Sequence, residues 1–348
     1  MKKILVSPMY GMGDTLMITP ALRVLKENRP NFLIECLTFQ KVSYDLLMGN
    51  PFIDKLIFYP LLKKSKFESL FYIFKNLTGR YDTVINFYPS NRLDYNLFSF
   101  LTMAKERIGH RYLKSNFCQL NWLKNKTIKE DYYLHCVEEN IKLLKFFGIK
   151  VDKIPPMEIY LKEEEILNAN SYIKSISRKD IKIGIHTGTS SFKNHIYRRW
   201  PKEKFLEVIN RFKIADFFLF GTEEEKEENN FVLKNSKHKN AYLVENKSIR
   251  EVASIIKSLN LFISNDSGLM HLAAAVGSPV VAIFGPTNPN WVRPWGVKYR
   301  IIRLNLPCSP CFFYSPKPLM CHIKEKYKCI KEIESGEVLK AIQELLGL

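Results

Sequence analysis

Short apolar runs alternate with longer amphipathic stretches along the chain. In the first half, strand-like runs lie at 3–7, 32–38, 55–59, 82–87 and 106–109. Stretches with a helical spacing of apolar residues lie at 15–28, 66–77, 92–103 and 134–147. Strands that alternate with helices predict a parallel sheet with crossover helices. The alternation stops at 148–156, where Pro155 and Pro156 predict a linker between two domains.

The same alternation starts again after the linker. Strands are predicted at 181–185, 216–220, 240–244, 260–264 and 279–284, and helices at 202–213, 223–235, 248–258, 268–276 and 335–346. Pro201 suits the first position of its helix, and Ser248 with Glu251 has the spacing of a capping box. We therefore predict an α/β protein of two Rossmann-like, doubly wound domains, 1–154 and 155–348, facing each other across a cleft. Ligands bind at the carboxyl ends of the strands in such sheets, so functional residues are expected in the strand-to-helix loops.

A formal net charge of +18 in 348 residues is the most unusual feature of the composition. Basic residues concentrate from Lys55 to Arg80 and from Lys105 to Lys129, and each stretch contains a single acidic residue. Such charge attracts polyanions: nucleic acid, anionic lipid headgroups or a phosphorylated glycolipid. Aromatic residues are interleaved with the lysines of the first stretch, at Phe67, Phe71, Tyr72 and Phe74. That pattern favours docking on a membrane surface; solvated surface or a buried amphipathic helix would produce the same pattern.

The N-terminus predicts a first strand and turn. The apolar residues after Lys2 and Lys3 are soon interrupted by Pro8 and Gly11, whereas a signal peptide needs a longer apolar core. No apolar run approaches the roughly 18–20 residues that cross a bilayer. We expect a cytoplasmic protein. The basic and aromatic stretch is also compatible with peripheral attachment at the inner face of the cytoplasmic membrane.

The seven cysteines do not predict a secreted disulfide scaffold in a chain of this length. Four of them, with His322 among them, form a C-x2-C-x9-C-x7-C pattern: Cys308, Cys311, Cys321 and Cys329. This spacing is compatible with a structural zinc ion. Reduced thiols that pack in the interior are the alternative, and the one we favour.

Two polar loops, one in each half, have residues suited to a ligand. In the first, Gly11 and Gly13 leave room for a sharp turn, and Asp14 follows at a helix start. Asp14 is either an N-cap or a general base. In the second, a polar run with Gly188 and Thr189 precedes Arg198-Arg199-Trp200-Pro201. Hydroxyls and arginines ahead of a helix N-terminus favour anion binding, with solvent-facing arginines as the alternative.

The third loop joins an apolar strand to a helix that contains His271 in its first turn. Its sequence is Ser264-Asn265-Asp266-Ser267-Gly268-Leu269-Met270-His271. Free N–H groups at 267–269 together with His271 are suited to a pyrophosphate, while Asp266 either caps the helix or orients a sugar hydroxyl. The chain continues through small residues into a buried strand and a second polar turn, Gly285-Pro286-Thr287-Asn288-Pro289.

The stretch from Asp266 to Pro289 resembles the signature of glycosyltransferase family nine, the ADP-heptose:lipopolysaccharide heptosyltransferases. Other motifs match in the family's order: Gly11-Met12-Gly13-Asp14, Thr19-Pro20-Ala21-Leu22, Arg198-Arg199-Trp200-Pro201 and Gly221-Thr222-Glu223. The resemblance extends over nearly the whole chain. It implies a GT-B fold with the acceptor on the N-terminal domain and the nucleotide sugar on the C-terminal domain.

The resemblance also assigns roles to residues. Asp14 corresponds to the catalytic base, and Arg198 stands where many members have a phosphate-binding lysine. The residues that match the family's diphosphate and sugar contacts are Asp266, Ser267, Gly268 and His271. Those that match its nucleotide contacts are Gly188, Thr189 and one glutamate of 223–225, for which we favour Glu225. The implied reaction is inverting transfer of heptose from ADP-L-glycero-D-manno-heptose to the inner core of lipopolysaccharide, a phosphorylated glycolipid acceptor. No Asp-x-Asp motif occurs, which favours a mechanism without a metal or other cofactor.

Three alternatives remain at the level of sequence. In the first, the donor is another nucleotide sugar used for surface polysaccharide or glycolipid. In the second, the protein is a basic nucleic-acid-binding protein, and in the third it binds a sugar nucleotide without catalysis. We do not expect nucleic acid as a partner, because it leaves the three glycine-bearing loops without a role. The sequence does not predict an oligomeric state.

Overall fold

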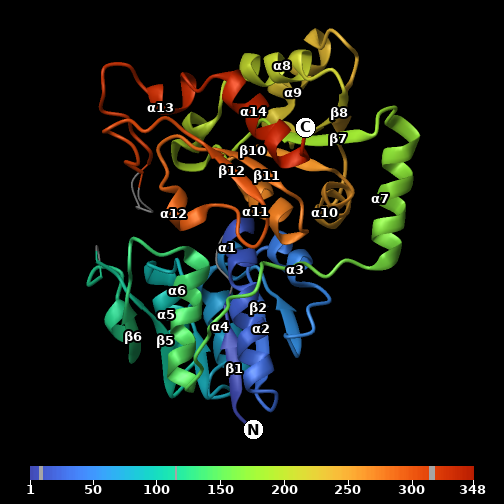
Figure 1. Ribbon diagram of the computed structural model, residues 1–348. Coiled ribbons are helices and arrows are strands. Elements are labelled where there is room, and N and C mark those ends of the chain that lie inside the picture. Colours follow the sequence, from blue (N-terminus) through green and yellow to red (C-terminus); the bar gives the residue numbers. More distant parts are fainter. Residues whose placement is uncertain (8–10, 114–115, 313–317) are drawn as a thin grey trace. The chain divides into compact units, whose positions relative to one another are not determined.

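The computed structural model describes residues 1–7, 11–113, 116–312 and 318–348. The contacts divide the chain into two compact units, Met1–Tyr160 and Leu161–Leu348. The sequence places this boundary after residue 154, within the same connecting segment. Figure 1 shows the helices and strands of both units along the chain. Residues 8–10 of the first predicted loop and Lys114 of the second basic stretch lie outside the described residues.

The described part of unit 1 is a six-stranded parallel sheet with helices. Its strands are β1 (Lys3–Val6), β2 (Leu33–Thr38), β3 (Lys55–Phe58), β4 (Thr83–Ile85), β5 (Glu106–Arg111) and β6 (Lys126–Lys129). Its helices are α1 (Met12–Met17), α2 (Thr19–Asn28), α3 (Lys41–Leu47), α4 (Lys66–Asn76), α5 (Leu93–Leu101) and α6 (Cys136–Lys142). The strand order β3-β2-β1-β4-β5-β6 is that of a Rossmann fold.

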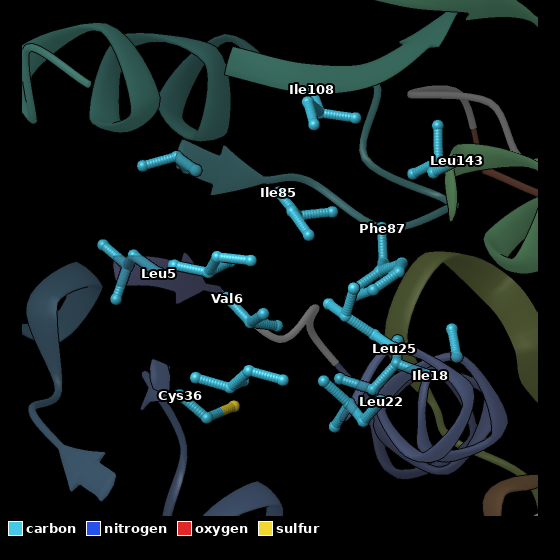
Figure 2. Close-up of a cluster of buried hydrophobic side chains, with 14 of the residues drawn as sticks. Leu5, Val6, Ile18, Leu22, Leu25, Cys36, Ile85, Phe87, Ile108 and Leu143 are labelled. Atoms are coloured by element: carbon cyan, nitrogen blue, oxygen red, sulfur yellow. The ribbon is translucent and has the colours of Figure 1, made fainter. Parts of the chain in front are cut away.

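The core of unit 1 forms where α2 packs on the central strands. Ile18, Leu22 and Leu25, spaced by three or four residues, lie on one face of this segment and are fully buried. Figure 2 shows these side chains together with Val6 of β1 and Phe87 after β4. This packing fixes the carboxyl end of β1, from which the first candidate loop leaves.

Unit 2 repeats the architecture in its described residues. Its strands are β7 (Ile181–His186), β8 (Ala215–Phe220), β9 (Ala241–Val244), β10 (Leu261–Asn265), β11 (Val280–Ile283) and β12 (Tyr299–Ile302). Its helices are α7 (Glu163–Ile176), α8 (Lys202–Arg211), α9 (Lys226–Asn235), α10 (Ile249–Lys257), α11 (Gly268–Ala275), α12 (Pro289–Val292), α13 (Lys328–Lys331) and α14 (Ser335–Leu346). The order β12-β11-β10-β7-β8-β9 is again that of a Rossmann fold. The predicted α/β class with two Rossmann-like domains is confirmed, and the cleft between them stays a prediction.

Several element boundaries differ from the predicted ones. The helix predicted at 15–28 is two helices, α1 and α2, which meet at Ile18. Pro201 is the N-cap of α8 instead of its first residue. The capping box of Ser248 and Glu251 is present at α10. Of the described helices, none is long and apolar enough to cross a membrane.

Candidate active site

The candidate loops leave each sheet at the point where its strand order reverses. In unit 1 the neighbours at this point are β1 and β4, and in unit 2 they are β7 and β10. Loops that diverge from two adjacent parallel strands leave a crevice at their carboxyl ends, which is where open α/β sheets bind ligands. The loop with Asp14 follows β1, and the loops with Gly188 and Asp266 follow β7 and β10.

Gly11 is the N-cap of α1 and sets the direction of the first loop. Its φ of 104° lies in a region that favours glycine, and a Cβ there would lie 3.2 Å from Oδ2 of Asp14. Asp14 is therefore inside the first turn of α1, two residues after its first residue Met12, and the N-cap position belongs to Gly11. The N-cap alternative for Asp14 is wrong. Gly13 is the second residue of the helix, so its place in the predicted turn is also wrong.

The carboxyl of Asp14 is in a desolvated environment. Burial raises the pKa of Asp14 from 3.8 to about 7, because removal from water disfavours the charged form. A carboxyl with a pKa near neutrality is a better proton acceptor than an ordinary aspartate at the same pH. The neighbouring Thr15 donates its hydroxyl hydrogen bond to the Gly11 carbonyl at 2.9 Å, which holds the loop at the helix start.

In unit 2, Arg198 joins the two loops at the strand-order reversal. Its guanidinium donates to the main-chain oxygen of Asp266 and pairs with the Asp266 carboxylate. Nε of Arg198 is buried and, among the described residues, has no hydrogen-bond partner. A guanidinium with an unused donor beside a helix start is suited to a phosphate oxygen.

The amino end of α11 lies at the same place. Ser267 is its N-cap but makes no side-chain capping bond; its hydroxyl instead contacts Nδ1 of His186 at 2.9 Å. The first N–H groups of an α-helix have no partner within the helix. Those of α11, which begins at Gly268, are consequently not satisfied by the usual cap and are suited to an anion.

His271 is buried in the first turn of α11 and is neutral near pH 7. Burial lowers the pKa of His271 to about 4, while Asp266 and Arg198 act in opposite directions. Its Nδ1 has no hydrogen-bond partner within the described ranges. A buried ring nitrogen without a partner is costly, which indicates that a ligand satisfies it.

Glu225 supports the loop that follows β7 and contains Gly188 and Thr189. Its Oε1 accepts from Arg199 at 3.0 Å, and its Oε2 accepts from the N–H and hydroxyl of Thr222, each at 2.9 Å. A Cβ at Gly188 would lie 2.1 Å from Cγ of Glu225, so only glycine fits there. Thr189 donates its hydroxyl to the His195 carbonyl and accepts from Arg199 through its own carbonyl. Direct nucleotide contacts of these residues stay predictions.

Asn265 and Trp200 form a framework that sequence reasoning did not assign to the site. The Asn265 amide donates to the carbonyls of Thr187 and Gly188 at 2.8 and 3.2 Å and accepts from Trp200 N–H at 2.9 Å. The Trp200 indole donates to the Ile333 carbonyl at 3.0 Å. Asn265 belongs to the third polar loop, but its three partners lie elsewhere in the chain, so no local pattern in the sequence indicates its role.

The four clustered cysteines line one cavity of about 90 Å³ together with His322. Burial raises the pKa of the Cys329 thiol to about 11, which favours its protonated form. Within the ranges that the structure describes, no three His, Cys, Asp or Glu side chains are grouped to hold a metal ion. Zinc binding stays a prediction of the spacing, and no chemistry below depends on it.

Comparison with known proteins identifies the family. Residues 70–319, more than half of the chain, match the family described as "Glycosyltransferase family 9 (heptosyltransferase)". The chain belongs to glycosyltransferase family 9. The matched region of this family 9 enzyme contains Gly188, Arg198, Asp266 and His271, whereas Asp14 precedes it.

The similarity of this family 9 glycosyltransferase extends over its full length. Lipooligosaccharide heptosyltransferase 2 of Campylobacter jejuni is 26% identical, with 99% of this chain and 98% of that protein covered. The glycosyl transferase family 9 structure from Veillonella parvula has a TM-score of 0.80 at 24% identity, covering 99% of this chain and 97% of that one. ADP-heptose LPS heptosyltransferase II of Escherichia coli has a TM-score of 0.77 at 21% identity, covering 99% and 98%. These structures share the fold.

Proposed function

We propose that this family 9 glycosyltransferase transfers heptose from ADP-L-glycero-D-manno-heptose to the inner core of lipopolysaccharide, with inversion at the anomeric carbon. The observation that carries the proposal is a group of three neighbouring features in unit 2. Nε of Arg198 and Nδ1 of His271 are buried and have no hydrogen-bond partner in the described part of the chain. The third feature is the start of α11, where the N-cap residue makes no side-chain capping bond. The names of the relatives in Campylobacter jejuni and Escherichia coli support heptose as the sugar.

The proposed reaction uses one residue of unit 1 as base. A hydroxyl of the acceptor attacks the anomeric carbon, a new C–O bond forms, and the bond from that carbon to the diphosphate oxygen breaks. Asp14 accepts the hydroxyl proton, and ADP leaves with the bonding electrons. A positioned base contributes about 10²–10⁴-fold.

The proposed role of unit 2 is to stabilise the leaving diphosphate. Arg198 supplies a fixed positive charge, and the start of α11 supplies N–H groups and the positive end of the helix dipole. His271 is neutral, so its proton stays on one nitrogen and it contributes an oriented hydrogen bond. Because these groups neutralise the developing charge, we propose that transfer continues in the presence of EDTA.

The base assignment is tested with Asp14→Ala in the full-length protein. Transfer from ADP-heptose to heptose-deficient lipopolysaccharide is followed by mass spectrometry, and ADP binding by calorimetry. We expect kcat to fall about 10²–10⁴-fold with the ADP dissociation constant unchanged. The matched control is Asp152→Ala at an exposed position. Equal transfer by the Asp14 variant would refute the assignment.

The donor assignment is tested with the parent enzyme and a panel of nucleotide sugars on the same acceptor. The contacts around the diphosphate do not depend on the sugar, so the alternative is another donor for a surface glycolipid. We expect product with ADP-heptose at the highest kcat/KM. Higher kcat/KM with a different nucleotide sugar would replace heptose but leave the proposed chemistry in place.

A further inference from the structure

Helix α4 presents an apolar stripe to solvent. It begins after Ser65, which forms a capping box with Glu68, and its buried side consists of Ser69 and Ile73. On its other side, four apolar residues are exposed: Phe67 (78%), Leu70 (41%), Phe71 (59%) and Phe74 (57%). Their spacing of three, four and seven residues from Phe67 places them on one face of the helix. Figure 1 labels α4 among the helices of unit 1.

This stripe is not explained by the packing of the described chain. The capping box, the buried Ser69 and Ile73 and the partly buried Tyr72 attach the helix to the core, and the three phenylalanines each keep more than half of their surface exposed. Scattered exposed apolar residues are ordinary, whereas a contiguous group on one helix face marks an interaction surface. The buried-helix interpretation of this basic and aromatic stretch is therefore wrong.

Positive charges border the stripe. Lys63, Lys64, Lys66, Lys75 and Arg80 are all exposed. The one acidic residue of this stretch, Glu68, accepts from the main chain and hydroxyl of Ser65 and pairs with Lys64 at 3.4 Å. The ammonium of Lys75 lies 5.6 Å from the centre of the Phe71 ring, so charge and apolar surface are in contact. The stripe thus carries a net positive border.

We infer that α4 lies in the plane of a membrane and anchors the protein to an anionic lipid surface. The phenylalanines enter the boundary between headgroups and acyl chains, and the lysines contact anionic headgroups. A second copy of the chain fits less well, because a twofold axis through the stripe would bring like charges together. The inference goes beyond the proposed function, since it concerns where the enzyme binds and not which sugar it transfers.

Vesicle sedimentation with the full-length protein tests the inference. The probes are sucrose-loaded vesicles of phosphatidylcholine with phosphatidylglycerol, and of phosphatidylcholine alone, both free of glycolipid acceptor. We expect binding to the anionic vesicles, at least tenfold weaker binding of the double variant Phe67→Ser/Phe71→Ser, and weaker binding at high salt. The control Leu167→Ser/Ile214→Ser removes two exposed apolar residues of unit 2 and is expected to bind as the parent does.

Two further measurements separate the outcomes. Circular dichroism and ADP affinity are expected to be unchanged in the Phe67→Ser/Phe71→Ser variant, because both side chains are exposed. Equal vesicle binding by parent and variant, or no binding by the parent, would overturn the inference. So would a parent dimer that becomes monomeric in the variant, since the stripe would then be an interface between copies. Because the vesicles contain no acceptor, failure here leaves the proposed transfer reaction standing.

Discussion

The properties of Asp14 depend on its neighbour Gly11 and on packing. The positive φ of Gly11 starts α1 early enough to place Asp14 inside the first turn of the helix. Burial of the carboxyl then raises its pKa, because the charged form is removed from water.

The pH dependence of transfer is predicted from Asp14. With a pKa of about 7, the carboxyl is largely protonated at pH 6 and largely ionised at pH 8. Only the ionised form accepts a proton, so kcat/KM is expected to rise with pH and level off above roughly pH 8. Initial rates between pH 5.5 and 9 check this. A profile that falls over this range would contradict the role of Asp14 as base.

Affinity for the intact donor, measured without acceptor, provides the control for that profile, because a diphosphate esterified at both ends has no proton to lose in this range. His271 and His186 have pKa values lowered to about 4 and about 3 by burial, so both stay neutral over the range. The donor dissociation constant is therefore expected to change much less than kcat/KM. A matching change in both would assign the titration to donor binding.

At the scale of elements, the sequence predicts the central strands and, of the edge strands, β3 and β9. It does not predict the edge strands β6 and β12, because Lys126–Lys129 and Tyr299–Ile302 are short and of mixed polarity. α7 was missed because only Ala169 and Ile173 of its fourteen residues are buried, so its apolar periodicity is weak. Central strands carry long apolar runs because both faces are covered.

Asn265, at the end of β10, is predicted to hold in place the loop that follows β7. Asn265→Ala leaves two carbonyls and one N–H buried without this partner, so the free energy of unfolding should fall by at least about 2 kcal/mol. Urea denaturation measures this, and the KM for the donor should rise as well. Asn235→Ala, at an exposed position in α9, is the matched control. A loss no larger than that of the control would show that the loops are held by other contacts.

At the scale of the whole molecule, the sequence predicted two similar units but not how the charge is arranged on them. The net charge alone is compatible with nucleic acid, lipid or glycolipid. Exposure of the phenylalanines of α4 together with the neighbouring lysines distinguishes one basic stretch as amphipathic. Which residues of α4 are exposed depends on which face of the helix packs on the sheet. The sequence does not predict that face, because apolar residues lie on both faces of the helix.

The proposal that unit 2 binds the donor and unit 1 the acceptor gives a prediction for hydrogen exchange. ADP at about 100 times its dissociation constant stabilises its site by about 2.7 kcal/mol. We expect slower amide exchange in the loops at 187–189 and 266–271, with the strands β1 and β4 unchanged. Mass spectrometry of peptides with and without ADP measures this. Protection confined to unit 1 would reverse the assignment of donor and acceptor domains.

The hydrogen bond from the Trp200 indole to the Ile333 carbonyl connects residues 133 positions apart. The chain emerges from the ribosome in sequence order. The Trp200 indole therefore cannot form this hydrogen bond until Ile333 has been added, when nearly all of the protein has been made. Unit 2 can thus be completed only late in translation, whereas every strand of unit 1 is available to assemble well before then.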